Sequence, residues 1–157
     1  MEAIGYLLKN AQQSLRAAMD AALRDLAITT PQYAVLAFLE EAPGLSGAQL
    51  ARRAFVTPQT MNRIVVHLQA AGLIERGPHP DVGRVLEARL SRRGQSLLAE
   101  CHRRVRQVEA RMVTGLKPGE QRQLAHLLER CLANLRPSGR RRRPALRKPA
   151  DKPAITR

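Results

Sequence analysis

The sequence contains few aromatic residues and few cysteines. Its 157 residues include two Tyr, two Phe and no Trp, which argues against the aromatic platforms that stack the bases of single-stranded nucleic acids. The two cysteines form neither a disulfide framework nor a zinc site. No signal peptide or apolar stretch of membrane-spanning length is present. We therefore expect a protein of the reducing cytosol that makes no membrane contact.

Patterns that carry catalysis or bind metals are also missing. There is no nucleophile–base pair, phosphate-binding loop or plausible carboxylate pair, so we expect no enzyme activity. The four histidines are scattered, without clustered Cys, Asp or Glu at ligand spacing, so we expect no metal and no cofactor. Cys101 and Cys131 fall on apolar helix stripes, and we expect both to be buried rather than to sense redox state.

Positive charge is abundant and unevenly distributed. Lys and Arg total 27 against 13 Asp and Glu, a net charge of +14, which points to a polyanionic partner. Residues 136–157 carry +8 of this charge, with four prolines and few apolar residues, so we expect a disordered tail. The tail either strengthens phosphate binding through counterion release or is simply solvated.

Both ends of the chain are predicted to be amphipathic helices. Residues 4–26 and 97–116 each have apolar residues at three- and four-residue steps, and a third helix with one leucine-rich side follows the break at 117–119. These stripes are larger than one small chain can cover. We therefore expect a homodimer interface built from both termini.

The middle of the chain is predicted to hold a helix pair and a hairpin. Thr30 and Pro31 are expected to start a helix that is buried on most sides, Ser46 and Gln49 form a capping box before a helix at about 47–54, and Thr57 caps the next helix. Strands at 73–76 and 85–90 follow, the second with Leu86, Ala88 and Leu90 on one face. A helix-turn-helix followed by a hairpin is a winged helix.

The predicted fold class is mainly α with a small β-hairpin. It comprises a winged helix-turn-helix lobe and a helical dimerisation region formed by the N- and C-terminal helices. The expected divisions are an N-terminal dimerisation helix (1–28), the DNA-binding lobe (29–91), C-terminal dimerisation helices (92–135) and the basic disordered tail (136–157).

Three stretches together resemble the MarR (multiple antibiotic resistance regulator) family of bacterial transcription regulators. They are TTPQYAVLAFL (29–39), GLSGAQLARRAFVTPQTMNRIVVHLQAAGLIER (44–76) and GRVLEARLSRRG (83–94). The resemblance implies a homodimer with two lobes in adjacent major grooves and wings in the flanking minor grooves. It also implies that a small phenolic or lipophilic ligand, bound between lobe and dimer region, releases the DNA.

Candidate DNA contacts lie on three elements. Arg63 and Asn62 can reach base edges, whereas Thr60 and His67 either touch DNA or face water, and the cap alone explains Ser46. The family's wing usually has an acid two positions before an arginine; here Asp81 lies three before Arg84, so either Asp81 acts from a shifted loop or His79 is a second wing contact. The full set is Thr57, Gln59, Thr60, Asn62, Arg63 and His67 on the second helix, Ser46, Gln49 and Arg52 on the first, and His79, Asp81 and Arg84 on the wing.

Two further expectations concern the ligand and the function. Tyr6, Tyr33 and Phe38 either line a ligand pocket in the lobe–dimer cleft or pack in the core. We expect a sequence-specific regulator of double-stranded DNA, a repressor, that acts on a pseudo-palindromic operator and is released by a small-molecule effector. The alternative is an architectural or non-specific DNA-binding protein without an operator.

Overall fold

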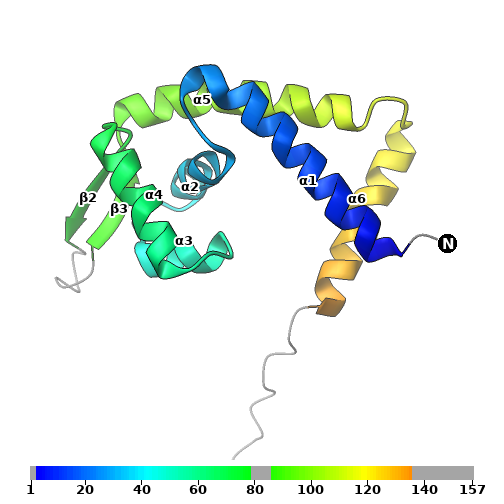
Figure 1. The fold of residues 1–157 in the computed structure, drawn as a ribbon, viewed down its shortest axis with the longest axis horizontal. Helices are drawn as coiled ribbons and strands as arrows, with labels where there is room; N and C mark the ends of the chain where they lie inside the picture. Colours follow the sequence, from blue (N-terminus) through cyan, green and yellow to red (C-terminus); the bar gives the residue numbers. More distant parts are fainter. Residues whose placement is uncertain (1–2, 79–85, 136–157) are drawn as a thin grey trace, which may run out of the picture. The chain divides into compact units, whose positions relative to one another are not determined.

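The computed structural model describes residues 3–78 and 86–135 of the chain. The chain forms two units, Met1–Thr114 and Gly115–Arg157. The predicted fold class is confirmed, because the described elements are mostly helical with one small sheet (Figure 1). In chain order they are α1 (Ile4–Leu23), η1 (Arg24–Leu26), α2 (Thr30–Glu41), β1 (Leu45–Ser46), α3 (Gly47–Arg53), α4 (Pro58–Ala70), β2 (Ile74–Pro78), β3 (Leu86–Leu90), α5 (Arg92–Met112) and α6 (Pro118–Leu135).

Strand β3 is the centre of a three-stranded antiparallel sheet of order β1-β3-β2. In the β2–β3 hairpin Ile74 lies opposite Leu90 and Pro78 lies opposite Leu86. The predicted hairpin is therefore present, shifted by one or two residues at the strand ends. The sequence pattern does not predict β1, because two residues are too few to show the alternation of a strand.

The predicted inner face of β3 is wrong at one position. Ala88 is buried and Leu90 is half-buried, but Leu86 is 46% exposed. The pairing of β1 with β3 extends no further than Glu87, so Leu86 lies beyond the covered part of the sheet. The Glu87 side chain is buried instead, with its Oε2 3.0 Å from Nη2 of Arg89.

Helix α2 starts one residue earlier than the cap pattern predicts. Thr29 is the N-cap, and it forms a capping box with Gln32: the Thr29 hydroxyl accepts from the Gln32 N–H, and Gln32 Oε1 accepts from the Thr29 N–H at 2.9 Å. The Thr30 N–H and hydroxyl donate instead to Asp20 Oδ1, at 2.9 and 2.6 Å. These two hydrogen bonds lower the pKa of Asp20 and hold α1 against the start of α2.

Helix α5 begins at Arg92, five residues before the predicted helix start at 97. Ser91 is the N-cap, and its hydroxyl accepts from the Gly94 N–H and donates to the carbonyl of Gly72 at 2.7 Å. The helix ends at Met112, so Leu116, which the sequence pattern includes in it, lies outside. The start was misplaced because apolar periodicity marks only the buried stripe of a helix, whereas the N-cap decides where the helix begins.

The core of the first unit joins the lobe to α1 and α5. Helix α2 packs against α1, α5, β3, α3 and α4 (Figure 1). Its buried residues are Gln32, Val35, Leu36 and Leu39, and Tyr33, Ala34, Ala37 and Phe38 are half-buried. The core cluster also takes in Leu23, Leu50, Met61, Leu68, Ile74, Leu98 and Cys101.

Helix α6 carries the leucine-rich side that the sequence predicts. No α6 residue is buried in the described structure, and the leucines of the stripe are 37% to 80% exposed. Cys101 is buried as expected, but Cys131 on α6 is exposed. The expectation for Cys131 is therefore wrong within this chain, where Cys131 shares the exposure of the α6 leucines.

Among the described residues, no helix is both long and apolar enough to span a bilayer.

Gly94 is the tightest point of the fold and provides a test of it. A Cβ at this position would fall on the backbone carbonyl oxygen of Leu73, so we expect Gly94→Ala to lower the free energy of unfolding by about 3 kcal/mol, the upper end of overpacking. The matched control is Gly119→Ala on α6, where a Cβ meets open space and the helix gains roughly 0.5–1 kcal/mol. Denaturant melts measure both; equal stability of the two variants would contradict the packing.

Candidate nucleic-acid interface

Helices α3 and α4 are fixed at their starts by local hydrogen bonds. The predicted capping box of α3 is confirmed: Gln49 Oε1 accepts from the Ser46 N–H at 2.8 Å, and the Ser46 hydroxyl accepts from the Gln49 N–H at 3.3 Å. The predicted cap of α4 is also confirmed, because the Thr57 hydroxyl accepts from the Thr60 N–H at 3.2 Å, with Pro58 in the first turn. The residue at which each helix starts is therefore fixed by its own cap.

Helix α4 divides into a buried and an exposed face. Met61, Val65 and Leu68 are buried. All six residues predicted to read DNA from this helix are exposed, namely Thr57, Gln59, Thr60, Asn62, Arg63 and His67. Within residues 3–78 and 86–135, the side chains of Gln59, Asn62, Arg63 and His67 have no hydrogen bond or ion pair. They are available to an external partner, and their contacts with DNA stay a prediction.

The other candidate residues on these helices are partly engaged. The hydroxyls of Thr57 and Thr60 lie 2.9 Å apart, and the Ser46 hydroxyl donates to Gln49 Oε1 at 2.9 Å. Arg52 is exposed and has no ion pair with any described residue. Its neighbour Arg53, for which the sequence leaves open phosphate contact or solubility, pairs with Glu41 at 3.2 Å.

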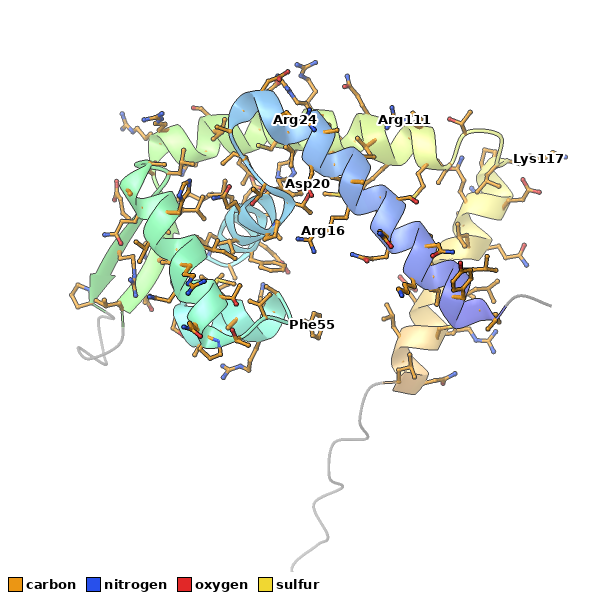
Figure 2. All side chains as sticks on the ribbon, viewed as in Figure 1. Arg16, Asp20, Arg24, Phe55, Arg111 and Lys117 are labelled. Carbon is orange, nitrogen blue, oxygen red and sulfur yellow. The ribbon has the colours of Figure 1, made fainter. Side chains whose placement is uncertain are left out.

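The turn between α3 and α4 contains an unusual residue. Phe55 has a φ of 54°, in the left-handed region that side chains rarely adopt, and it is 96% exposed. Figure 2 shows its ring projecting away from the helices of the lobe. The turn keeps this conformation because the Val56 N–H donates to the Ala51 carbonyl at 3.1 Å and closes the turn around Phe55.

The wing is described only at its base. Strand β2 ends at Pro78 and strand β3 begins at Leu86, and these two residues are paired. The predicted wing contacts His79, Asp81 and Arg84 fall outside the described residues and stay predictions.

A cavity of about 320 Å³ opens between α1, α2 and the α3–α4 pair. Most of its lining is apolar, and the charged lining residues are Arg16 from α1 and Arg53 from α3. A second hollow, of about 390 Å³, shares Arg16 with the cavity and adds Asp20 and Arg24. Figure 2 labels Arg16, Asp20 and Arg24 along the same stretch of α1 and η1. The lining of the cavity is Gln12, Leu15, Arg16, Met19, Thr30, Pro31, Ala34, Phe38, Arg53, Ala54, Val56 and Ile64.

The three aromatic residues predicted for a ligand pocket lie in different places. Phe38 lines the cavity, and Tyr6, near the start of α1, is 56% exposed and does not line it. The Tyr33 hydroxyl lies 2.9 Å from His102 Nδ1, and His102 Nε2 lies 2.9 Å from Glu40 Oε2. Burial, and then the charge of Glu109, raise the pKa of Tyr33.

Arg16 and Arg53 are not among the residues that the sequence predicts for a pocket. Arg16 follows Leu15 inside an apolar helix stripe, and an arginine at the margin of such a stripe is the signal that could have suggested a charged group facing a pocket. Arg53 carries no such signal, because its place in the cavity depends on tertiary packing. No group of His, Cys, Asp and Glu in the described part of the chain could hold a metal ion.

A capped helix pair followed by an antiparallel hairpin, with a free polar face on the second helix, defines a winged helix-turn-helix protein of the DNA-binding class. Comparison with known proteins agrees. Residues 28–85 match the family model described as MarR family. The chain is 39% identical, over 127 residues, to the HTH-type transcriptional repressor Rv2887 of Mycobacterium tuberculosis, covering 81% of this chain and 91% of that protein. The chain belongs to the MarR family.

Two solved structures of that relative are similar to this chain. The structure of the Mycobacterium tuberculosis MarR family protein Rv2887 in complex with DNA has a TM-score of 0.72 and 36% identity, and covers 83% of this chain and 98% of that one. Its complex with salicylic acid has a TM-score of 0.70 and 38% identity, covering 83% and 97%.

Phe55 generates a test of the turn. The left-handed conformation costs a non-glycine residue about 1–2 kcal/mol, while glycine costs roughly 0.5–1 kcal/mol in chain entropy. Because the exposed ring buries little surface, we expect Phe55→Gly to leave the chain at least as stable as the wild type. Thermal unfolding measures this, with Phe55→Ala, which keeps the strain, as the control. A Phe55→Gly protein clearly less stable than Phe55→Ala would show that the left-handed backbone at this position holds no strain for glycine to relieve.

Proposed function

We propose that this protein is a sequence-specific repressor that binds double-stranded DNA as a homodimer and is released by a small aromatic acid. The observation that carries the proposal is the exposed polar face of α4, on which Gln59, Asn62, Arg63 and His67 have no side-chain partner among the described residues. Two facts about the 39% identical relative support the proposal: it is named a transcriptional repressor, and its structure has been solved in complex with DNA. We also propose that the protein works in the bacterial cytosol and has no catalytic role.

The predicted DNA-contacting residues on α4, on α3 and on the wing have different roles. The guanidinium of Arg63 matches the major-groove edge of guanine, and the side-chain amide of Asn62 matches that of adenine. Thr57 and Gln59, at the start of α4, place N–H, hydroxyl and amide groups for phosphate contact. Ser46 at the N-cap of α3, and Gln49 and Arg52 on α3, contact the phosphate backbone of the DNA. Arg84 on the wing enters a narrow minor groove, where negative potential attracts a guanidinium.

The homodimer is built from the terminal helices. The first two turns of α1 leave Ile4, Leu7 and Leu8 exposed, and the leucines of α6 are exposed as well. Burying such side chains contributes about 1.5–3 kcal/mol each. We propose the division 1–28 and 92–135 for dimerisation, 29–91 for DNA and 136–157 as a basic tail. A two-fold dimer matches a pseudo-palindromic operator.

The cavity at α1 is the proposed effector site. Its volume of about 320 Å³ and mostly apolar lining suit a single aromatic ring, and Arg16 offers a charge for a carboxylate. The salicylic acid complex of the relative supports this class of ligand.

The operator can be tested by selecting genomic DNA fragments with the purified protein. We expect the fragments to share a pseudo-palindrome with half-sites about one helical turn apart. Arg63→Ala should weaken binding by roughly 5- to 150-fold and relax preference at one base pair per half-site, as measured by fluorescence anisotropy. The control Arg103→Ala removes the same charge from α5, where it pairs with Glu100, and should keep the preference. Fragments without any shared motif would instead favour an architectural DNA-binding protein.

The effector site can be tested with salicylate itself. We expect salicylate to bind the full-length protein and to raise its Kd for the selected operator. Arg16→Gln should weaken salicylate binding by roughly 10-fold or more, because it removes a hydrogen bond to a charged group; Arg103→Gln should not. Calorimetry measures the affinity. Unchanged affinity in Arg16→Gln would place the ligand elsewhere.

A further inference from the structure

Arg53 takes part in three contacts that lie between the cavity and the DNA-reading helix. It lines the cavity, its Nη1 lies 3.2 Å from Glu41 Oε2, and its guanidinium carbon lies 6.0 Å from the centre of the Phe38 ring. Arg53 is the last residue of α3, and Glu41 is the last residue of α2. One side chain therefore ties the end of α3 to α2 at the edge of the cavity.

The Arg53–Glu41 ion pair is weak enough to be exchanged. The Arg53 side chain is 38% exposed and that of Glu41 is 71% exposed, and such surface pairs contribute roughly 0.2–1 kcal/mol. A carboxylate inside the cavity, by contrast, would meet Arg53 beside a mostly apolar lining and further from water than Glu41 does. Charge-assisted hydrogen bonds are stronger in such surroundings. A ligand carboxylate can therefore compete with Glu41 for this guanidinium.

A movement of Arg53 would reach α4 through a short and rigid connection. Ala54 and Val56, on either side of Phe55, also line the cavity, as does Ile64 on α4. The turn is held by hydrogen bonds from the Ala54 N–H to the Leu50 carbonyl, at 2.9 Å, and from the Val56 N–H to the Ala51 carbonyl. The end of α3 and the start of α4 must therefore move together.

We propose that Arg53 couples the cavity to DNA binding: the carboxylate of a small aromatic acid, held by Arg16, replaces Glu41 as the partner of Arg53. The end of α3 then shifts from α2 toward the ligand and carries the start of α4 with it. The two α4 helices of a dimer no longer match their half-sites, and the DNA is released. This inference rests on the effector site proposed above and names the residue that transmits its occupancy.

The test measures the coupling ratio, which is the Kd for the operator at saturating salicylate divided by the Kd without it. Linked binding sites commonly give ratios of about 5 to 150, and we expect the full-length wild type to fall in this range. Arg53→Gln should still bind salicylate through Arg16, more weakly, but its ratio should be near 1. Arg53→Lys keeps the charge and should retain a larger ratio than Arg53→Gln.

Two more variants separate the coupling from simple charge loss. Glu41→Gln removes the competing carboxylate, so salicylate should bind the DNA-free protein about 2- to 5-fold more tightly, as the worth of the surface pair implies. Arg52→Gln is the matched control, since it removes the same charge from the same helix but Arg52 neither lines the cavity nor pairs with a described acid. Its DNA affinity falls in both states, and its ratio stays that of the wild type.

The outcomes distinguish this inference from the proposed function. A wild-type ratio of 1 overturns the effector function and the role of Arg53 with it. A large wild-type ratio that persists in Arg53→Gln overturns the role of Arg53 alone, as does a Glu41→Gln protein that binds salicylate no more tightly than the wild type. Equal ratios for Arg52→Gln and Arg53→Gln also overturn it, because net charge would then explain the effect.

Discussion

The junction of Ser91, Gly94 and the Gly72–Leu73 backbone supports the rest of the first unit. At this point the end of α4, the start of the hairpin and the first turn of α5 meet: the Ser91 hydroxyl donates to the Gly72 carbonyl, the Ser91 N–H donates to the Leu73 carbonyl, and Gly94 lets the helix approach the same carbonyl. The close approach holds the backbone that follows α4, as the Thr57 cap holds its start. The orientation of the exposed polar face of α4 is therefore set from both ends of the helix.

The elements governed by local chemistry could be predicted from the sequence. The caps at Ser46 and Thr57 follow from short hydrogen bonds between residues three positions apart, so the helix pair and its exposed face were predicted correctly. The start of α2 shows the limit of this reasoning. Two adjacent threonines can both cap a helix, and Asp20, ten residues away, decides between them by binding Thr30.

The parts that depend on tertiary packing could not be predicted. The cavity brings together residues from four helices, so neither Arg16 nor Arg53 stands out in the sequence as its charged lining. Strand β1 forms only because β3 offers it an edge. Tyr33 was a candidate for the ligand pocket, but its hydroxyl lies against His102, a residue 69 positions away that no local pattern connects with it. Apolar periodicity gave the inner face of α4 and the middle of that of α5, but it missed the buried Leu98 and included the exposed Met112, and it did not show where α5 begins or ends.

The polar chain from Tyr33 through His102 to Glu40 has a mechanical consequence. It fastens α2 to α5 with two hydrogen bonds of 2.9 Å, in addition to the apolar contacts between them. The only ion pair between α2 and α3 among the described residues is the exposed one of Glu41. The polar contacts of α2 therefore tie it more firmly to the long helix α5 than to α3. Under the coupling proposed above, the boundary that opens would lie inside the winged helix, between α2 and α3, rather than at its border with α5.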